Sequence, residues 1–181
     1  KHIAVEISCD KEDTHNMLSD LGLPVPQQRL VYSPNEAIRA AQARIAPYVH
    51  RTPVLTCRSL DEATGARLFV KCENLQKVGA FKARGACNAV FALPAETAFR
   101  GVVTHGAALA YAAQQRGIPA HVVMPENAPK IKVANVQGFG ARVHFCAPTL
   151  AAREAMCADV GRTTGATLVH PWNRDLCEEE A

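Results

Sequence analysis

Lys82 is the residue whose type and setting could do chemistry, because it follows the glycine-containing loop 73–81 and precedes a run with helical periodicity. An apolar run comes before that loop. The order of residues therefore predicts that Lys82 begins a helix at the carboxyl edge of a sheet, where α/β proteins bind ligands. The positive end of the helix dipole disfavours a charged ammonium group there, and a neutral lysine amine is a nucleophile that can form a Schiff base. The residues alone allow two interpretations, a nucleophilic lysine or a solvated lysine at a helix start.

Cysteine and histidine, which also do chemistry in many proteins, are not grouped along the chain. The seven cysteines include no C-x-x-C pair, and the seven histidines include no H-x-H or H-x-x-x-H spacing. Zinc sites and disulfide frameworks need closer grouping than this. We expect no metal site, and we expect the cysteines to be reduced thiols that mostly pack as small apolar side chains.

Length, composition and charge exclude several classes of protein. The chain has 181 residues, of which 48% are apolar and 20% charged, and its formal net charge is +3. This length can bury one core, and the charge is too small to indicate a nucleic-acid surface. No apolar run approaches the roughly 18 residues of a membrane span, and the start of the chain lacks the pattern of a signal peptide. We therefore expect a cytoplasmic protein with neither nucleic-acid nor membrane partners.

Short apolar runs alternate with helical patterns after residue 50, which predicts an α/β fold. Val-rich runs joined by helices are typical of a parallel sheet with helices on both faces. A separate helix is predicted up to residue 45, with Ser33 as its N-cap and Pro34 at its first position. The predicted strands cover 67–72, 101–105, 121–124, 142–145 and 167–170, and the other predicted helices cover 82–93, 107–116, 129–137 and 149–163.

Residues 39–173 resemble the N-terminal half of a pyridoxal-phosphate (PLP) enzyme of fold type II, the family of threonine and serine dehydratases, serine racemase and 3-hydroxyaspartate ammonia-lyase. In this family the lysine of the F-K-x-R-G motif carries the cofactor. The resemblance therefore implies that Lys82 is the cofactor lysine and that Phe81 lies beside the pyridine ring. The Gly-Ala-Phe-Lys sequence at 79–82 is similar to the 3-hydroxyaspartate ammonia-lyase branch. The matching residues are 44–46, 50–55, 71–74, 79–86, 116–120, 124–125, 129–132 and 138–141.

The resemblance implies an α,β-elimination on a hydroxy amino acid: serine, threonine or 3-hydroxyaspartate. Lys82 would release the cofactor to the substrate and take the α-proton, and the β-hydroxyl would then leave. Ammonia and a 2-oxo acid would be the products, with pyridoxal phosphate supplying the electron sink. The expected function is that of a PLP-dependent ammonia-lyase or dehydratase with a small amino acid as its substrate.

Two departures from the family predict impaired or absent catalysis by these residues. The family has a Ser-x-Gly-Asn-His loop that grips substrate and cofactor, whereas here Thr104-His105 passes directly into Gly106-Ala107, which leaves few amides for a carboxylate. The family's glycine-rich phosphate loop would lie beyond Ala181, and Gly138-Phe139-Gly140 has instead the pattern of a helix end. The alternatives are a non-catalytic α/β domain or a fused or decayed remnant.

Residues 1–38 resemble a different protein, the ATP-grasp domain of cyanophycin synthetase at its start. The resemblance rests on residues 4–11 and on the turn 22–26. It implies an ATP-grasp-like segment over 1–38 and a dehydratase-like segment over 39–181, the latter containing a small parallel-sheet domain at 85–170. A fragment of an ATP-dependent carboxylate-amine ligase is therefore a further alternative function.

Half of a two-domain enzyme would expose the apolar residues that its other half covers. Val54-Leu55 and Leu68-Phe69-Val70 would belong to the larger sheet of the family. Exposed apolar surface of this kind favours association between copies. We therefore expect a homo-oligomer.

Overall fold

The computed structural model describes residues 34–169. The ATP-grasp-like segment lies outside the described residues apart from 34–38, and so does everything predicted for 170–181. The helix predicted from Pro34 to residue 45 begins and ends as predicted. The elements are α2 (Pro34–Ile45), β1 (Val54–Leu55), α3 (Arg58–Thr64), β2 (Val70–Lys71), η1 (Glu73–Leu75), η2 (Lys77–Gly79), α4 (Lys82–Ala92), α5 (Ala95–Ala98), β3 (Val102–Thr104), α6 (Ala108–Arg116), β4 (Ala120–Pro125), α7 (Lys130–Gly138), β5 (Arg142–Cys146), α8 (Leu150–Thr164) and β6 (Thr167–Leu168).

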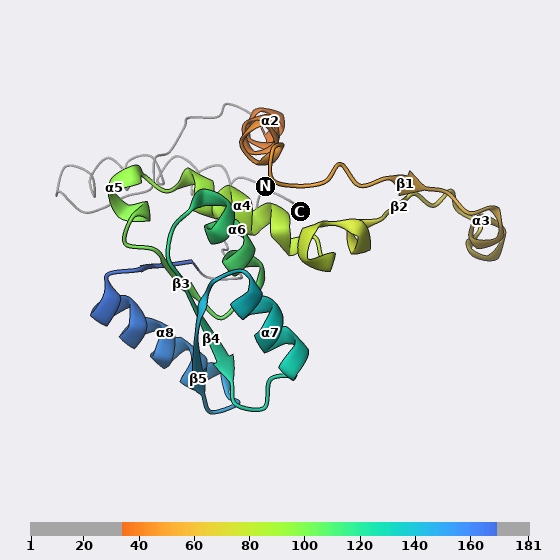
Figure 1. Ribbon diagram of the computed structural model, residues 1–181. Helices are drawn as coiled ribbons and strands as arrows, with labels where there is room; N and C mark the ends of the chain where they lie inside the picture. The colour runs from red at the N-terminus through yellow and green to blue at the C-terminus, as the bar shows by residue number, and fades with distance from the viewer. Residues whose placement is uncertain (1–33, 170–181) are drawn as a thin grey trace, which may run out of the picture.

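Four parallel strands form the main sheet in the order β5-β4-β3-β6 (Figure 1). The chain steps from β3 to β4 to β5 toward one edge and then returns to the opposite side of β3 as β6. The strand order therefore reverses at β3. α/β proteins bind ligands at such a reversal, beyond the carboxyl ends of the strands. The predicted α/β class with a parallel sheet is confirmed.

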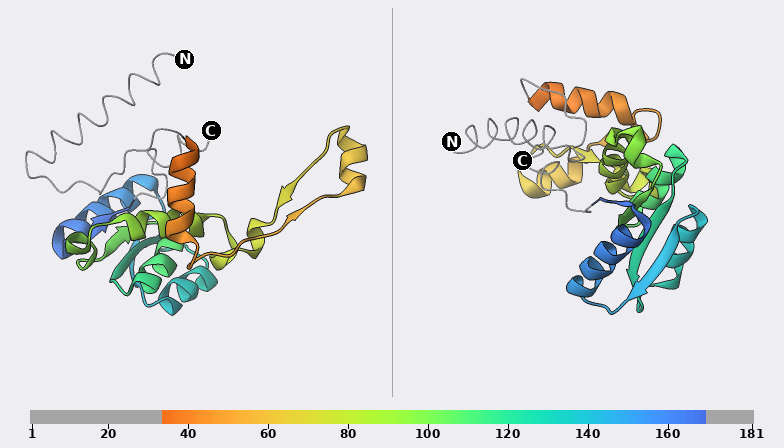
Figure 2. Two further views of the ribbon diagram at one scale, coloured as in Figure 1. Left: turned by 90° about the horizontal axis from the view of Figure 1, so that it is seen from above. Right: turned by 90° about the vertical axis from the view of Figure 1, so that its left-hand side faces the viewer.

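Different helices cover the two faces of this sheet (Figure 2). Val102 and Val122 belong to a core shared with α6 and α7, whereas Val103 and Val123 belong to a second core shared with α8. Consecutive residues of a strand point to opposite faces, so a strand buried on both sides has a continuous apolar sequence. The predicted placement of helices on both faces is confirmed.

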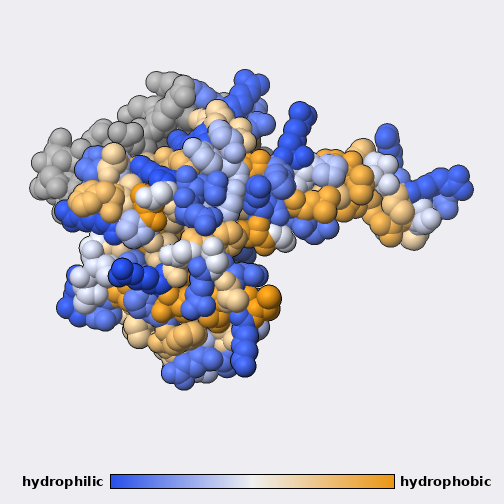
Figure 3. Space-filling view, viewed as in Figure 1, coloured by the Kyte–Doolittle hydropathy of each residue, from blue (hydrophilic) through white to orange (hydrophobic). Residues whose placement is uncertain are grey.

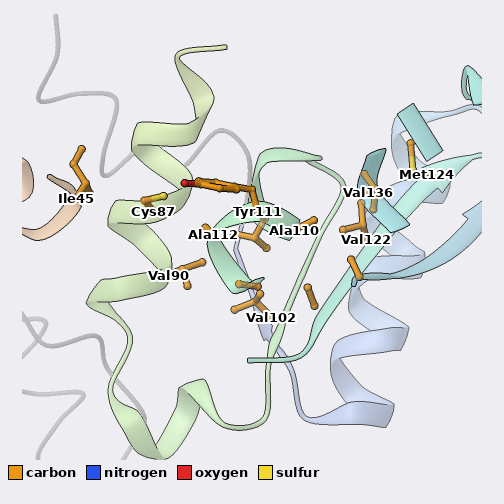
Figure 4. Packing of buried hydrophobic residues seen from close by; sticks show 14 residues of the cluster. Ile45, Cys87, Val90, Val102, Ala110, Tyr111, Ala112, Val122, Met124 and Val136 are labelled. Carbon is orange, nitrogen blue, oxygen red and sulfur yellow. The ribbon is translucent and has the colours of Figure 1, made fainter. Parts of the chain in front are cut away.

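Helix α4 forms a further layer over α6. Cys87 of α4 and Tyr111 of α6 lie in one core (Figure 4). At the other end of the two helices, the guanidinium of Arg116 in α6 donates to the carbonyls of Val90 and Leu93, the second at 2.7 Å. Cys87 meets Tyr111, and further along both helices Val90 meets Arg116. The helices α4 and α6 therefore run in the same direction.

Residues 54–71 leave the body of the molecule as an arm (Figures 1 and 2). Its strands β1 and β2 pair antiparallel, Val54 with Lys71 and Leu55 with Val70, and no residue of α3 at its tip is buried. The prediction of a strand over 67–72 is wrong in its length, because only Val70 and Lys71 are paired. The apolar run could not show that its partner is another short strand and not the parallel sheet.

Glycine is required where the chain enters β3. Gly101 has a φ of 85°, and a Cβ at this position would lie 2.5 Å from the carbonyl oxygen of Pro119. The backbone of β3 therefore approaches the segment before β4 more closely than any side chain allows. This contact begins the ladder, with Val102 N–H donating to Pro119 O at 2.9 Å.

The described cysteines are free thiols, four of which are buried: Cys72, Cys87, Cys146 and Cys157. Burial raises the pKa of the Cys87 and Cys157 thiols to about 11. The expectation that most cysteines pack as small apolar side chains is confirmed for these residues. Among the described residues, no helix is long and apolar enough to cross a membrane.

Candidate functional site

Lys82 is the first residue of α4, and the preceding Phe81 is its N-cap residue. Both side chains are exposed, and Phe81 has 62% of its surface accessible. The next helical residue, Ala83, is fully buried. Phe81 and Lys82 therefore face solvent, whereas the next residue, Ala83, packs in the core and holds the start of the helix there. The position predicted for Lys82, at the start of a helix, is confirmed.

The start of α4 lies at the same end of the molecule as the reversal of strand order. Because α4 and α6 run in the same direction, their first residues are at one end, and α6 begins just beyond the carboxyl end of β3. Lys82 precedes Cys87 by five residues and Ala108 precedes Tyr111 by three. Both helices start within about one and a half turns of the place where Cys87 and Tyr111 meet. Lys82 and the β3–α6 connection are therefore the parts of a candidate ligand site.

The connection between β3 and α6 consists of residues 105–107. Gly106 N–H donates to the hydroxyl of Thr104 at 3.2 Å, so one of its few amides is already engaged within the connection. Two amides in the first turn of α6 are engaged as well, because Leu109 N–H donates to Gly106 O and Ala110 N–H donates to Ala107 O, both at 3.2 Å. The positive end of the helix dipole still favours an anion there. The predicted short connection is confirmed, and it offers an anionic group little beyond the helix dipole.

The loop before Lys82 follows an unusual backbone path. Val78 has a φ of 56° and Gly79 a φ of 69°, so two consecutive residues adopt the left-handed conformation. Such a conformation is strained for a β-branched residue. The two residues turn the chain from η2 into the extended Ala80 immediately before Phe81 and Lys82.

Gln76 holds the middle of this loop to the segment before the arm. Its side chain accepts from the N–H of His50 and donates to the carbonyl of His50, both at 2.8 Å. The same oxygen accepts from the N–H of Lys77 at 2.8 Å, and the Gln76 side chain is buried. One amide group therefore replaces a strand as the hydrogen-bonding partner of the backbone at His50.

An ion pair joins the start of the loop to the first turn of α4. The Arg84 guanidinium donates to both oxygens of Glu73, at 2.9 and 2.7 Å, and to the carbonyl of His50 at 3.1 Å. The buried hydroxyl of Thr52 donates to Glu73 at 2.5 Å, and Lys71 Nζ donates to the Thr52 carbonyl at 2.6 Å. The pKa of Glu73 is lowered from 4.5 to about 2, chiefly by the hydrogen bonds from Arg84. Burial opposes this shift, and the hydrogen bond from Thr52 and the charges of Arg84 and Lys71 add to it.

The sequence indicated some of these residues and missed others. Arg84 forms an ion pair with Glu73, and Lys130 and Lys132 lie exposed on α7. The roles of Gln76 and Thr52 were missed, because their partners lie more than 20 residues away in the sequence. A polar side chain in a loop carries no signal of a distant partner.

The described residues fit part of a pyridoxal-phosphate group. Lys82 offers an amine for its aldehyde, and Phe81 offers an exposed apolar face for its ring. Gly138-Phe139-Gly140 ends α7 just before β5 begins, so it lies at the amino edge of the sheet, opposite Lys82. Its prediction as a helix end is confirmed, and it is not a phosphate loop for this site. Within residues 34–169, no three metal-ligating side chains are grouped.

Comparisons with known proteins point to one family. The family model described as "Pyridoxal-phosphate dependent enzyme" matches residues 45–179. Serine racemase from Arabidopsis thaliana is 52% identical over 142 residues, which are 76% of this chain and 43% of that protein. The beta-hydroxyaspartate dehydratase of Paracoccus denitrificans is 48% identical over 143 residues, 76% of this chain and 45% of that protein. The structure of maize serine racemase, 52% identical, matches with a TM-score of 0.72 over 75% of this chain and 43% of that one.

The match covers only part of this chain, and this chain covers only part of its relatives. The family match begins at residue 45, so the ATP-grasp-like segment 1–38 lies outside it and its resemblance stays a prediction. The chain spans less than half the length of these relatives. The family match covers the loop, the lysine and the sheet that the structure brings together. The chain belongs to the pyridoxal-phosphate-dependent enzyme family of fold type II.

Proposed function

We propose that this chain provides the cofactor lysine of a PLP-dependent lyase that acts on a small hydroxy amino acid. The observation that supports this is the position of Lys82, exposed at the first residue of α4 and beside the reversal of strand order. A solvated lysine at an arbitrary helix start would not need a strained, anchored loop before it. The activity of a whole enzyme is part of the proposal, since the chain spans under half of its relatives.

Lys82 has two tasks in this proposal. Its Nζ would hold the aldehyde carbon of pyridoxal phosphate, with loss of water, and after the substrate's amino group had displaced it, the free amine would take the α-proton. Phe81 excludes water from one side of the ring and orients it. The positive end of the α6 dipole favours an anionic group of the ligand at the start of that helix. The cofactor, when bound, supplies the electron sink that makes the α-proton acidic.

The substrate class follows from the relatives and from the Gly-Ala-Phe-Lys sequence. Serine, threonine and 3-hydroxyaspartate carry a β-hydroxyl that can leave after loss of the α-proton. A racemase, as two of the relatives are named, would return the proton to the other face of the same carbon. Both reactions begin with proton removal, so the role of Lys82 is common to them.

Reductive trapping tests this proposal. Pyridoxal phosphate is added, the adduct is reduced with borohydride, and the labelled peptides are mapped. We expect visible absorbance and a label chiefly at Lys82, both lost in Lys82→Ala and kept in the matched control Lys77→Ala. Equal labelling of all exposed lysines, with the same absorbance in Lys82→Ala, would support the alternative of a non-catalytic α/β domain.

Turnover is a separate measurement. Pyruvate, 2-oxobutyrate and oxaloacetate are assayed with serine, threonine and 3-hydroxyaspartate as substrates, and D-serine is assayed with L-serine. We expect little or no product from these 181 residues, because the described phosphate and carboxylate donors are few. Product that depends on Lys82 would establish which of the two reactions the chain performs.

We also propose that the chain is a homo-oligomer that associates through the arm. Val54, Leu55, Phe69 and Val70 are each about half exposed or more, and orange residues lie along the stem of the arm in Figure 3, whereas its tip is mostly blue. A two-stranded hairpin with free edges is marginally stable by itself. Residues 54–71 carry three cationic side chains and two carboxylates, so their net charge of +1 opposes the approach of a second copy only weakly.

A further inference from the structure

The Glu73–Arg84 pair closes the loop that carries the proposed cofactor lysine. Glu73 stands at the start of η1 and Arg84 in the first turn of α4, eleven residues later. The pair is bidentate, and only 19% of the Glu73 side chain is exposed. Two parallel N–H···O bonds fix the orientation as well as the distance of the joined segments.

The pair acts on Lys82 through the backbone. Residues two apart on a helix lie about 200° apart around its axis, so Arg84 and Lys82 occupy nearly opposite faces of α4. Arg84 N–H donates to the carbonyl of Phe81 at 2.9 Å, which joins the arginine directly to the residues before Lys82. A shift of Arg84 therefore moves the helix start and the lysine with it.

The strained turn needs such a restraint. Val78 at a φ of 56° would relax if the ends of its loop were free, because nothing in a β-branched residue favours that conformation. Gln76 fixes the middle of the loop on His50, and Arg84 reaches the same carbonyl of His50. Both ends and the middle of the loop are thus held against one segment of backbone.

We propose that Glu73 and Arg84 are positioning residues that hold Lys82 in its reactive place by closing loop 73–84. This rests on the proposed function, since it assigns the pair a task only if Lys82 binds the cofactor. Thr52 supports the pair by completing the hydrogen bonds of Glu73. A lysine held within a narrow range of positions reacts faster than one on a mobile loop.

Two variants test the pair: Glu73→Gln, which keeps the shape and removes the charge, and Arg84→Lys, which keeps the charge and removes the fork. Asp159→Asn is the matched control, because it removes the exposed pair with Arg162 at 2.5 Å. The first readout is amide hydrogen exchange of residues 76–83, with the amides of β4 as the internal reference for global opening. The second is the borohydride-trapped label at Lys82 relative to Lys130.

We expect exchange over 76–83 to rise about tenfold in both variants relative to β4, and the Lys82 to Lys130 labelling ratio to fall about tenfold. Asp159→Asn should change neither. Unchanged exchange and an unchanged ratio in Glu73→Gln overturn the positioning role alone, and so does faster exchange with a constant ratio. Equal labelling of Lys82 and Lys130 in the unsubstituted chain overturns the proposed function, and the positioning role with it.

Discussion

Substitution of Glu73 with glutamine should make stability less dependent on pH. The pKa of Glu73 is about 2 in the folded chain, against a usual 4.5, chiefly because Arg84 donates to its carboxylate. If the unfolded chain has the usual value, the difference corresponds to at most about 3.4 kcal/mol at neutral pH. Solvent still reaches 19% of the side chain. Screening therefore reduces the expected contribution to about 2 kcal/mol.

The sign of the effect follows from which state binds the proton first. Above about pH 5, Glu73 is charged in both states and its contribution is fully present. As the pH falls below 4.5, the unfolded chain takes up a proton while the folded chain does not, so the contribution shrinks. By pH 3 it should be less than half of its value at pH 7. Below pH 2 it should be almost gone.

Urea unfolding at pH 7, 5 and 3 measures the free energy of unfolding of the unsubstituted chain and of Glu73→Gln. All other carboxyl groups titrate in both chains, so the difference between them isolates Glu73. Glu62→Gln, which removes an exposed pair with Arg58, is the control and should change stability by less than about 0.5 kcal/mol at any pH. A Glu73→Gln difference that stays constant from pH 7 to pH 3 would refute the reasoning.

Three further substitutions test the fold and the arm. Gly101→Ala should lower the free energy of unfolding by about 3 kcal/mol, because its Cβ would lie 2.5 Å from a carbonyl oxygen. Gly117→Ala, also at positive φ but with open space around it, should lower the free energy of unfolding by only about 1 kcal/mol. Urea unfolding measures both losses, and equal losses would contradict the close approach at Gly101. Val78→Gly should raise stability by about 1 kcal/mol by relieving a φ of 56°, and a loss in the same assay would show that the turn is not strained. Phe69→Lys should abolish concentration-dependent sedimentation, while the equally exposed Ile131→Lys on α7 should not. A compact monomer for the unsubstituted chain at all concentrations would reject association through the arm.

The sequence predicted the parallel sheet and its helices because both patterns are local. The Val-rich strands are apolar at every position since both faces are buried, and α6 and α8 end at Gly117 and Gly165, whose left-handed conformation stops a helix. The prediction of a strand over 67–72 was wrong in its length because the partner of these residues is not set by a local pattern. The apolar residues of this run lie in an arm that leaves the body, where periodicity says nothing about a partner.

Within the candidate site, the sequence by itself determined that Lys82 begins a helix after a glycine-containing loop, because helix starts and turns depend on neighbouring residues. Only the tertiary structure decided that this helix runs in the same direction as α6, which brings Lys82 to the end of the sheet where the strand order reverses. It also decided that Thr52, Gln76 and Arg84 hold the loop. Such hydrogen bonds join residues 11 to 34 positions apart in the chain, so their partners exist only once the helices have packed.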